Sequence, residues 1–301
     1  MMQALIAFRY HRLYLKVPIM SNAYQFLTKN CGLIFITVLL VLPLGGCQKN
    51  AEGRSVLQLI PTRDLRLQAE QAYKTQLKEA KISQNTRQLK IVNRVTKRIT
   101  DRAEKMYGEY CRGFKWEVKL IDDDKTVNAY CMPGGKMAIY SGMLKVAKTE
   151  AAVAAVMGHE VAHALLEHAN ERMTQAKGLQ IGMALGQVAI KEAEYKGGKY
   201  DQYLMAALGL GGQVGLLLPY SRIHESESDK MGLRLSAAAG YDPMEAPRLW
   251  ERMKAQSKGA PPEFLSTHPN NDRRIRDLTA LIPSVETLYA KSPKYGKGEK
   301  L

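Results

Sequence analysis

The chain has 301 residues and a formal net charge of +15, because 44 Lys and Arg outnumber 29 Asp and Glu. Such a basic excess suits anionic lipid head groups or acidic protein segments, whereas no nucleic-acid-binding motif accompanies it, so we expect no nucleic-acid partner. No internal repeat is long enough to indicate a solenoid.

Residues 1–46 have the pattern of an export signal, with Met20 as a possible start. An uncharged apolar run at 32–44 precedes two glycines and Cys47, and such small residues permit cleavage. The leucine, two small residues and cysteine resemble a bacterial lipobox, in which Cys47 is lipidated and becomes the first residue. An uncleaved membrane anchor is the alternative, but the run is shorter than the roughly 20 residues of a spanning helix. We expect residues 47–63 to form a lipidated linker.

Export sets two further expectations. Gln48 is not the aspartate that commonly retains such lipoproteins in the inner membrane, so we expect the periplasmic face of the outer membrane. Cys111 and Cys131 are the cysteines of the mature domain beyond Cys47, and an oxidising periplasm favours a disulfide between them. Such a bridge would stabilise the fold by roughly 3 kcal/mol.

The first part of the mature domain shows helical periodicity and then the alternation typical of strands. A Pro-Gly-Gly turn at residues 133–135 separates the last two strands and predicts a hairpin. The expected elements are helices at 64–81 and 86–106 and strands at 116–121, 126–132 and 136–141.

A His-Glu-x-x-His pattern lies inside an alanine-rich run, 149–173, which Thr149 can begin as a helix cap. On a helix His159 and His163 stand one turn apart on one face, so both imidazoles can reach one ion. Glu160 lies about 100° round the helix, where it can take a proton from water without binding the metal. The alternative is a surface helix with two ordinary histidines, but apolar residues surround the motif. The pattern therefore predicts one Zn²⁺ per chain, with Glu160 as the general base.

A catalytic zinc takes three protein ligands and keeps a fourth position for water, so a third ligand is needed. One class of zinc protease places a histidine six residues after the second, but Ala169 stands there. His168 is excluded as well, because nine residues from His159 it would lie on the opposite side of a continuous helix. The third ligand must come from elsewhere in the chain.

The acidic segment 221–229 is the best source of that ligand. If it is helical, Glu225 and Asp229 share one face while Glu227 points away. Glu225 would bind the metal, and Asp229 would accept a hydrogen bond from a ligand histidine and fix its tautomer. Taken alone, the segment would be a solvated charged helix.

The two motifs together resemble the HtpX-type and CAAX-prenyl-endopeptidase-type zinc metallopeptidases, which pair the two-histidine helix with a downstream Ser-Arg-x-x-Glu-x-x-x-Asp helix. The resemblance covers roughly residues 89–281, with Ser228 where the common form has alanine. It extends to Asn128-Ala129-Tyr130, to Pro133-Gly134-Gly135, and to Thr267-His268-Pro269 with Arg273 or Arg274. The layout is closest to periplasmic lipoprotein members.

The resemblance implies a mostly helical α+β, zincin-like (gluzincin) domain with a small β-sheet, which we place at 64–285. It implies that Glu225 is the third ligand and that Asp229 supports the site. His268 would stabilise the oxyanion of the tetrahedral intermediate or cap the zinc at rest, and a structural hydrogen bond is the alternative. We expect residues 286–301 to form a basic flexible tail.

The segments between the two metal helices and after them complete the expectations. Two apolar segments, 178–190 and 203–218, are too short to span a bilayer and would form a lid or lie against the membrane. Gly240 would end the second metal helix, and a capping pattern at 242–245 would begin another that carries Trp250 towards the core.

By analogy, the substrates would be damaged or misassembled envelope proteins, with envelope assembly machinery as a possible partner. A chaperone or scaffold with little turnover is the alternative of a different class. Cleavage of prenylated peptides is a third possibility, which the exported context disfavours.

Overall fold

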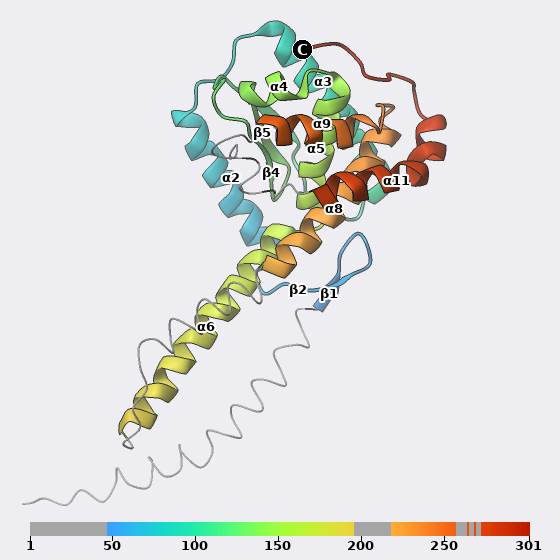
Figure 1. Cartoon of the computed structure of the whole chain (residues 1–301). Coiled ribbons are helices and arrows are strands. Elements are labelled where there is room, and N and C mark those ends of the chain that lie inside the picture. Colours follow the sequence, from blue (N-terminus) through green and yellow to red (C-terminus); the bar gives the residue numbers. More distant parts are fainter. Residues whose placement is uncertain (1–46, 196–217, 257–263, 265–267, 269–271) are drawn as a thin grey trace, which may run out of the picture. The chain divides into compact units, whose positions relative to one another are not determined.

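The computed structural model describes residues 47–195, 218–256, 264, 268 and 272–301, and of 185–195 and 218–221 only the backbone. Its elements, shown in Figure 1, are β1 (Cys47–Lys49), β2 (Ser55–Leu57), α2 (Thr62–Glu79), α3 (Thr86–Tyr107), β3 (Glu117–Ile121), β4 (Ala129–Met132), β5 (Lys136–Tyr140), α4 (Ser141–Ala147), α5 (Glu150–Leu165), α6 (His168–Tyr195), α8 (Leu218–Ala238), α9 (Glu245–Gln256) and α11 (Asp272–Ala290). Helices dominate and the strands form two small sheets, so the expected mostly helical α+β fold is confirmed. The expected export signal and most of the apolar segment 203–218 lie outside the described residues.

The larger sheet has the strand order β3-β5-β4. β3 runs parallel to β5, whereas β4 is antiparallel to it, with Ala129 opposite Ile139 and Met132 opposite Lys136. The predicted hairpin is therefore confirmed. β4 is an edge strand, and it is also the strand that packs against α5.

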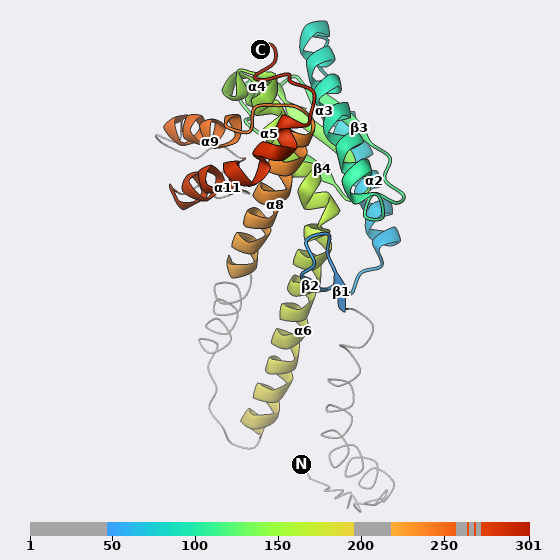
Figure 2. The same ribbon diagram turned by 90° about the vertical axis from the view of Figure 1, so that its right-hand side faces the viewer.

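α5 is the central helix of the domain, and Figure 2 shows it behind α8 and beside the sheet. Fifteen of its sixteen residues are buried, and it packs against α8, α3, β4 and α9. The side chain of Thr149 accepts a hydrogen bond from the Ala152 N–H at 3.2 Å, as the capping pattern predicts. Small alanine side chains let neighbouring elements approach this helix from all sides, so its histidines are buried.

A pair of glycines brings α5 and α8 into close contact. A Cβ atom on Gly232 would lie 2.7 Å from the backbone nitrogen of His159, and one on Gly158 would lie 2.8 Å from the Gly232 carbonyl oxygen. Larger residues cannot occupy these positions without separating the helices. The close approach places Glu225 on α8 within reach of the α5 histidines.

The helix that carries the metal motif is shorter than the sequence predicts. α5 ends at Leu165, Glu167 has a φ of 54°, and a new helix begins at His168. The expected continuous helix to about residue 173 is therefore wrong. The left-handed Glu167 interrupts the helical period between His163 and His168, so the phase of a continuous helix does not place His168 opposite His159.

The C-terminal residues 286–301, expected to be a flexible tail, are instead bound to the domain. The N–H groups of Glu150 and Ala151 donate to the carbonyl oxygens of Glu299 and Lys297 at 3.0 and 3.1 Å. These N–H groups belong to the first turn of α5, where backbone N–H groups have no acceptor within the helix. The tail thus completes the start of the metal-motif helix.

Cys111 and Cys131 are both free thiols, so the predicted disulfide is wrong. Cys111 lies in the turn after α3, whereas Cys131 lies on β4 and lines a hollow beside His163. The expectation relied on the presence of two thiols, which says nothing about their separation in space. Among the described helices, none is long and apolar enough to cross a bilayer.

Candidate metal centre

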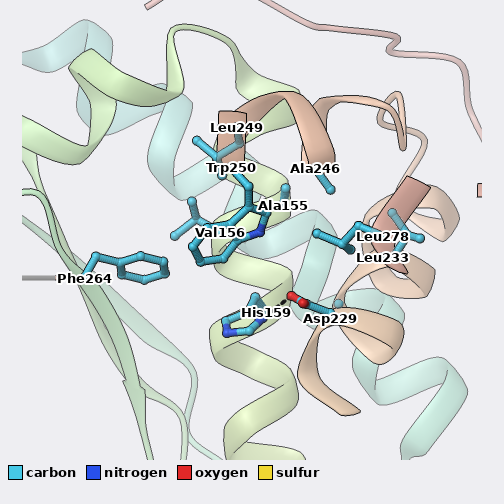
Figure 3. Close-up of a pocket in the computed structure, with 11 residues that line it drawn as sticks. Ala155, Val156, His159, Asp229, Leu233, Ala246, Leu249, Trp250, Phe264 and Leu278 are labelled. Atoms are coloured by element: carbon cyan, nitrogen blue, oxygen red, sulfur yellow. Dashed lines mark ion pairs between the residues drawn. The ribbon is translucent and has the colours of Figure 1, made fainter. Parts of the chain in front are cut away.

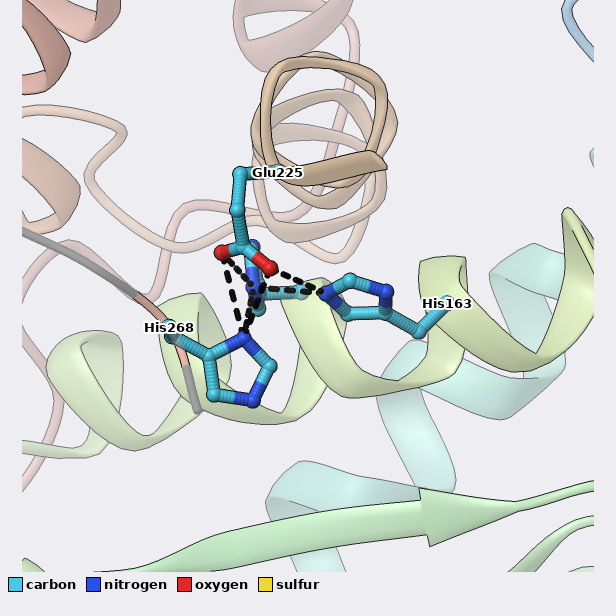
Figure 4. Close-up of side chains that lie close together, drawn as sticks. His163, Glu225 and His268 are labelled. Atoms are coloured by element: carbon cyan, nitrogen blue, oxygen red, sulfur yellow. Dashed lines mark hydrogen bonds and ion pairs between the residues drawn. The ribbon is translucent and has the colours of Figure 1, made fainter. Parts of the chain in front are cut away.

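Four buried side chains from three separate parts of the chain converge at one point. His159 and His163 come from α5, Glu225 comes from α8, and His268 comes from the segment before α11. Figure 4 shows the Glu225 carboxylate between the imidazoles of His163 and His268. Their ligand atoms all lie within 4.8 Å of one another. The structure therefore brings together the predicted metal ligands and adds His268 to them.

The spacing of His159, His163 and Glu225 is close to that of a tetrahedral zinc site, and His268 lies within 4.8 Å of all three. Bonds of 2.0–2.1 Å in a tetrahedron place the ligand atoms about 3.3 Å apart. The Nε2 atoms of His159 and His163 are 3.0 Å apart, and each lies 3.3 Å from a Glu225 oxygen. His268 Nδ1 lies 3.3 Å from His159 Nε2 and 3.0 Å from Glu225 Oε1. The donor set of three nitrogens and one carboxylate is one that zinc prefers.

The ionisation of the site also suits a cation. Burial opposes the charge of Glu225, but hydrogen bonds from His159, His163 and His268 hold its pKa far below the ordinary value. Burial lowers the pKa of His163 well below its ordinary value, so this imidazole is neutral, as a metal ligand must be. Burial and Arg274 oppose the charge of His159, but hydrogen bonds with Asp229 and Glu225 raise its pKa to about 9, so a metal must displace a proton from this imidazole. The site then presents one negative carboxylate among imidazole nitrogens.

Glu160 lies beside the cluster and outside the ligand set, as the helical phase predicts. It is 3% exposed, and its Oε1 atom lies 3.6 Å from His268 Nε2. Among the described residues Oε1 has no hydrogen-bond partner. Burial raises the pKa of this carboxyl group above its ordinary value, which makes the carboxylate a stronger base.

An acidic residue and an arginine hold the ligands from behind. His159 Nδ1 lies 3.0 Å from Asp229 Oδ1, so the predicted orienting contact is present. Arg274 binds Asp229 with two hydrogen bonds, of 2.6 and 2.7 Å, and lies 2.8 Å from Glu225. Burial would raise the pKa of Asp229, but Arg274 and His159 lower it. One guanidinium thus fixes the ligand carboxylate and the orienting carboxylate together.

Apolar side chains close the other side of His159. Figure 3 shows the rings of Trp250 and Phe264 facing the imidazole across a hollow, with Asp229 opposite them. The ring centroids lie 6.2 and 6.5 Å from that of His159. Arg274 stacks on Trp250, with 3.6 Å between the guanidinium carbon and the ring centroid. This packing excludes water and limits the rotation of the ligand.

Two supporting residues were missed or left open by the sequence. The choice between Arg273 and Arg274 follows from the buried face of α11, where Arg274 shares the spacing of Leu278 and Ile282. An arginine within such an apolar stripe indicates a buried acidic partner. His168 contacts His163, with 2.9 Å between their Nδ1 atoms, and the helix break that allows this carries no glycine or proline signal.

Comparison with known proteins agrees with the geometry. The model of peptidase family M48 matches residues 87–282, which contain every residue of the site. The chain is 34% identical over 183 residues to the mitochondrial metalloendopeptidase OMA1 of Schizosaccharomyces pombe, covering 60% of this chain and 51% of that protein. It is 28% identical over 248 residues to the human metalloendopeptidase OMA1, covering 77% of this chain and 45% of that protein.

A bacterial relative is similar as well. The β-barrel assembly-enhancing protease of Escherichia coli is 30% identical over 165 residues, which cover 52% of this chain and 32% of that protein. The chain therefore spans about half or less of the length of these relatives. The relatives include both mitochondrial and bacterial proteins.

Proposed function

The chain belongs to peptidase family M48, and we propose that it is a zinc-dependent endopeptidase. The observation that carries this proposal is the convergence of His159, His163 and Glu225 beside the buried Glu160 carboxylate. A structural zinc site needs no such base, because it only holds the fold together.

Each side chain has a distinct part in hydrolysis. Zinc, when bound, lowers the pKa of water towards about 7 and polarises the scissile carbonyl group. Glu160 takes the proton of the attacking water and delivers it to the leaving amine. Asp229 and Arg274 keep the ligands in place, and the apolar wall around His159 keeps bulk water out.

His268 supports a resting state in which the site is closed. Its Nδ1 atom lies 3.3 Å from His159 Nε2 and 3.0 Å from Glu225 Oε1, so it would hold a bound zinc as a fourth ligand in place of the water that a catalytic site keeps. His268 must leave this position before water and substrate enter. We expect His268→Ala to cleave an unfolded protein faster than wild type, whereas slower cleavage would favour the oxyanion role.

The substrates we propose are unfolded or misassembled envelope proteins, bound as an added strand at the β4 edge of the sheet, where β4 has no second partner strand among the described residues. Backbone hydrogen bonds at a sheet edge give affinity without demanding a particular side-chain sequence, as unfolded clients require. Export is supported by the signal-like pattern and by the lipobox at Cys47, which would tether the enzyme to the outer membrane. Similarity to a β-barrel assembly-enhancing protease supports a link to envelope assembly machinery.

The closed site also favours a second candidate, an assembly chaperone or scaffold with little turnover. A metal centre in which His268 is the fourth ligand would leave no place for water, so the protein would hold a client without cutting it. Under this candidate, His268→Ala would bind clients but remain inactive.

Casein cleavage by the full chain, with zinc counted in the same samples, tests the proposal. We expect Glu160→Gln to keep its zinc and to lose at least about 100-fold in turnover, since it removes the base. Glu286→Gln, which alters an exposed glutamate of α11, is the matched control and should remain active. The proposal would be refuted if the wild-type protein contained no zinc or if the Glu160→Gln variant remained active.

A further inference from the structure

A chain of buried polar contacts leads away from the metal centre through His163. The Nδ1 atom of His163 lies 2.9 Å from His168 Nδ1, and His168 Nε2 lies 3.0 Å from Glu227 Oε2. His168 is completely buried, and its ring stacks on His224 with 4.1 Å between centroids. These contacts lie on the far side of the His163 ring from the other metal ligands.

One arrangement of protons satisfies these contacts while His163 binds a metal. Its Nε2 atom must then be bare, so Nδ1 carries the proton and donates to His168 Nδ1. His168 in turn carries its proton on Nε2 and donates to the Glu227 carboxylate. The Ser228 hydroxyl, 3.3 Å from His168 Nδ1, is a second donor to the same acceptor.

Arg54 fixes the end of this series of contacts that lies farthest from the metal centre. Its guanidinium donates to Glu227 at 2.7 and 3.0 Å and to Glu171 at 2.8 and 2.7 Å. Both carboxylates are largely buried, and Glu171 also lies 3.0 Å from His224 Nε2. One arginine therefore neutralises two carboxylates that would otherwise repel each other and turn away from His168.

The segment that carries Arg54 is built to present it. In the N-terminal turn (50–54), the Asn50 side chain accepts from the N–H groups of Glu52 and Arg54 at 3.1 and 3.0 Å. Glu52 is held by Arg234 and Lys230 of α8 at 2.7 and 2.8 Å. The turn is thus pinned to α8, and Arg54 reaches inward from it.

We propose that Arg54 and His168 are positioning residues of the metal centre, through which the N-terminal turn sets metal affinity. Arg54 holds Glu227, Glu227 holds His168, and His168 fixes the tautomer and ring orientation of His163. The inference rests on the proposed function, because it requires a metal at His163. It gives the first residues after Cys47 a part in the site, although none of them touches the metal.

Zinc affinity of the full chain, measured by competition with a chelator, tests the inference without any cleavage assay. Loss of a partner that orients a ligand raises the dissociation constant by about 10- to 100-fold. We expect His168→Gln to lie within that range, Arg54→Met to lie near its lower end, and Arg54→Lys to restore part of the affinity. The visible spectrum of the Co²⁺ form should change in Arg54→Met.

Arg94→Met is the matched control. Arg94 is 35% exposed and pairs with Glu150, which is 3% exposed, whereas Arg54 is 24% exposed and pairs with Glu171, which is 4% exposed. Both variants should lower the Tm, but only Arg54→Met should weaken zinc binding.

The double variant Arg54→Met/His168→Gln should bind zinc no more weakly than His168→Gln alone, because Arg54 acts through His168. Additive losses, or wild-type affinity in Arg54→Met with a lower Tm, would make Arg54 merely structural and overturn the inference. If the wild type binds no zinc, the inference and the proposed function both fall.

Discussion

The close contact between α5 and α8 makes Gly232→Ala a direct test of how packing builds the site. The new Cβ would lie 2.7 Å from the His159 nitrogen and 2.9 Å from its Cα, against about 3.5 Å for an unstrained contact. The helices must therefore separate by roughly 0.8 Å. Metal sites tolerate errors of only about 0.2 Å, so Glu225 would no longer fit the metal that His159 binds.

The magnitude follows from two opposing effects. Alanine in place of glycine within a helix stabilises by about 1 kcal/mol, whereas overpacking costs about 1–3 kcal/mol. Gly182→Ala on α6 is the matched control, because a Cβ there meets no described residue within 4 Å. Gly182→Ala should gain the first effect alone, so the free energies of unfolding of the two variants should differ by about 1–3 kcal/mol.

Urea unfolding and chelator competition on both variants measure these effects. We expect Gly232→Ala to bind zinc at least about tenfold more weakly, which corresponds to about 1.4 kcal/mol, and Gly182→Ala to bind it normally. Equal stability of the two variants together with unchanged zinc affinity would show that the glycine contact does not position the ligands.

Three further outcomes follow from the site. Arg274→Met leaves the carboxylates of Asp229 and Glu225 buried without their cation, so the free energy of unfolding of the zinc-free protein should fall by about 3–5 kcal/mol in urea. Burial opposes the charge of Glu171, but Arg54 helps to hold its pKa at about 2 against 4.5 ordinarily. The stabilisation that the ionised Glu171 gives the folded state is present above pH 4.5 and is lost as the pH falls towards 2. Glu171→Gln should therefore flatten the fall of the Tm at acid pH. Removal of zinc by a chelator should lower the Tm reversibly, because an ion at 1,000 times its dissociation constant stabilises the folded state by about 4 kcal/mol.

The elements that the sequence predicted are those that depend on local periodicity. The spacing of His159 and His163 places them on one helix face, and the same rule pairs Glu225 with Asp229. The hairpin around residues 133–135 follows from its turn residues. These predictions hold because each depends on a few consecutive dihedral angles.

The failures have the opposite character. His168 is outside the ligand cluster, as expected, but the phase of a continuous helix placed it wrongly, because a break without glycine or proline turned it towards His163. The tail was expected to be flexible from its composition, yet backbone groups at the start of α5 bind it. The disulfide was inferred from a count of thiols, which contains no distance.

The sequence by itself predicted which side chains share a helix face, His159 with His163 and Glu225 with Asp229, because helical spacing is local, and the resemblance of these motifs predicted the family and the site roles. Only the tertiary structure decided that His268 joins the cluster of His159, His163 and Glu225, that Arg274 rather than Arg273 holds the carboxylates, and that Arg54 reaches the back of the site. These contacts join residues 43 to 173 positions apart, and they form because closely packed helices bury charges that must then find partners.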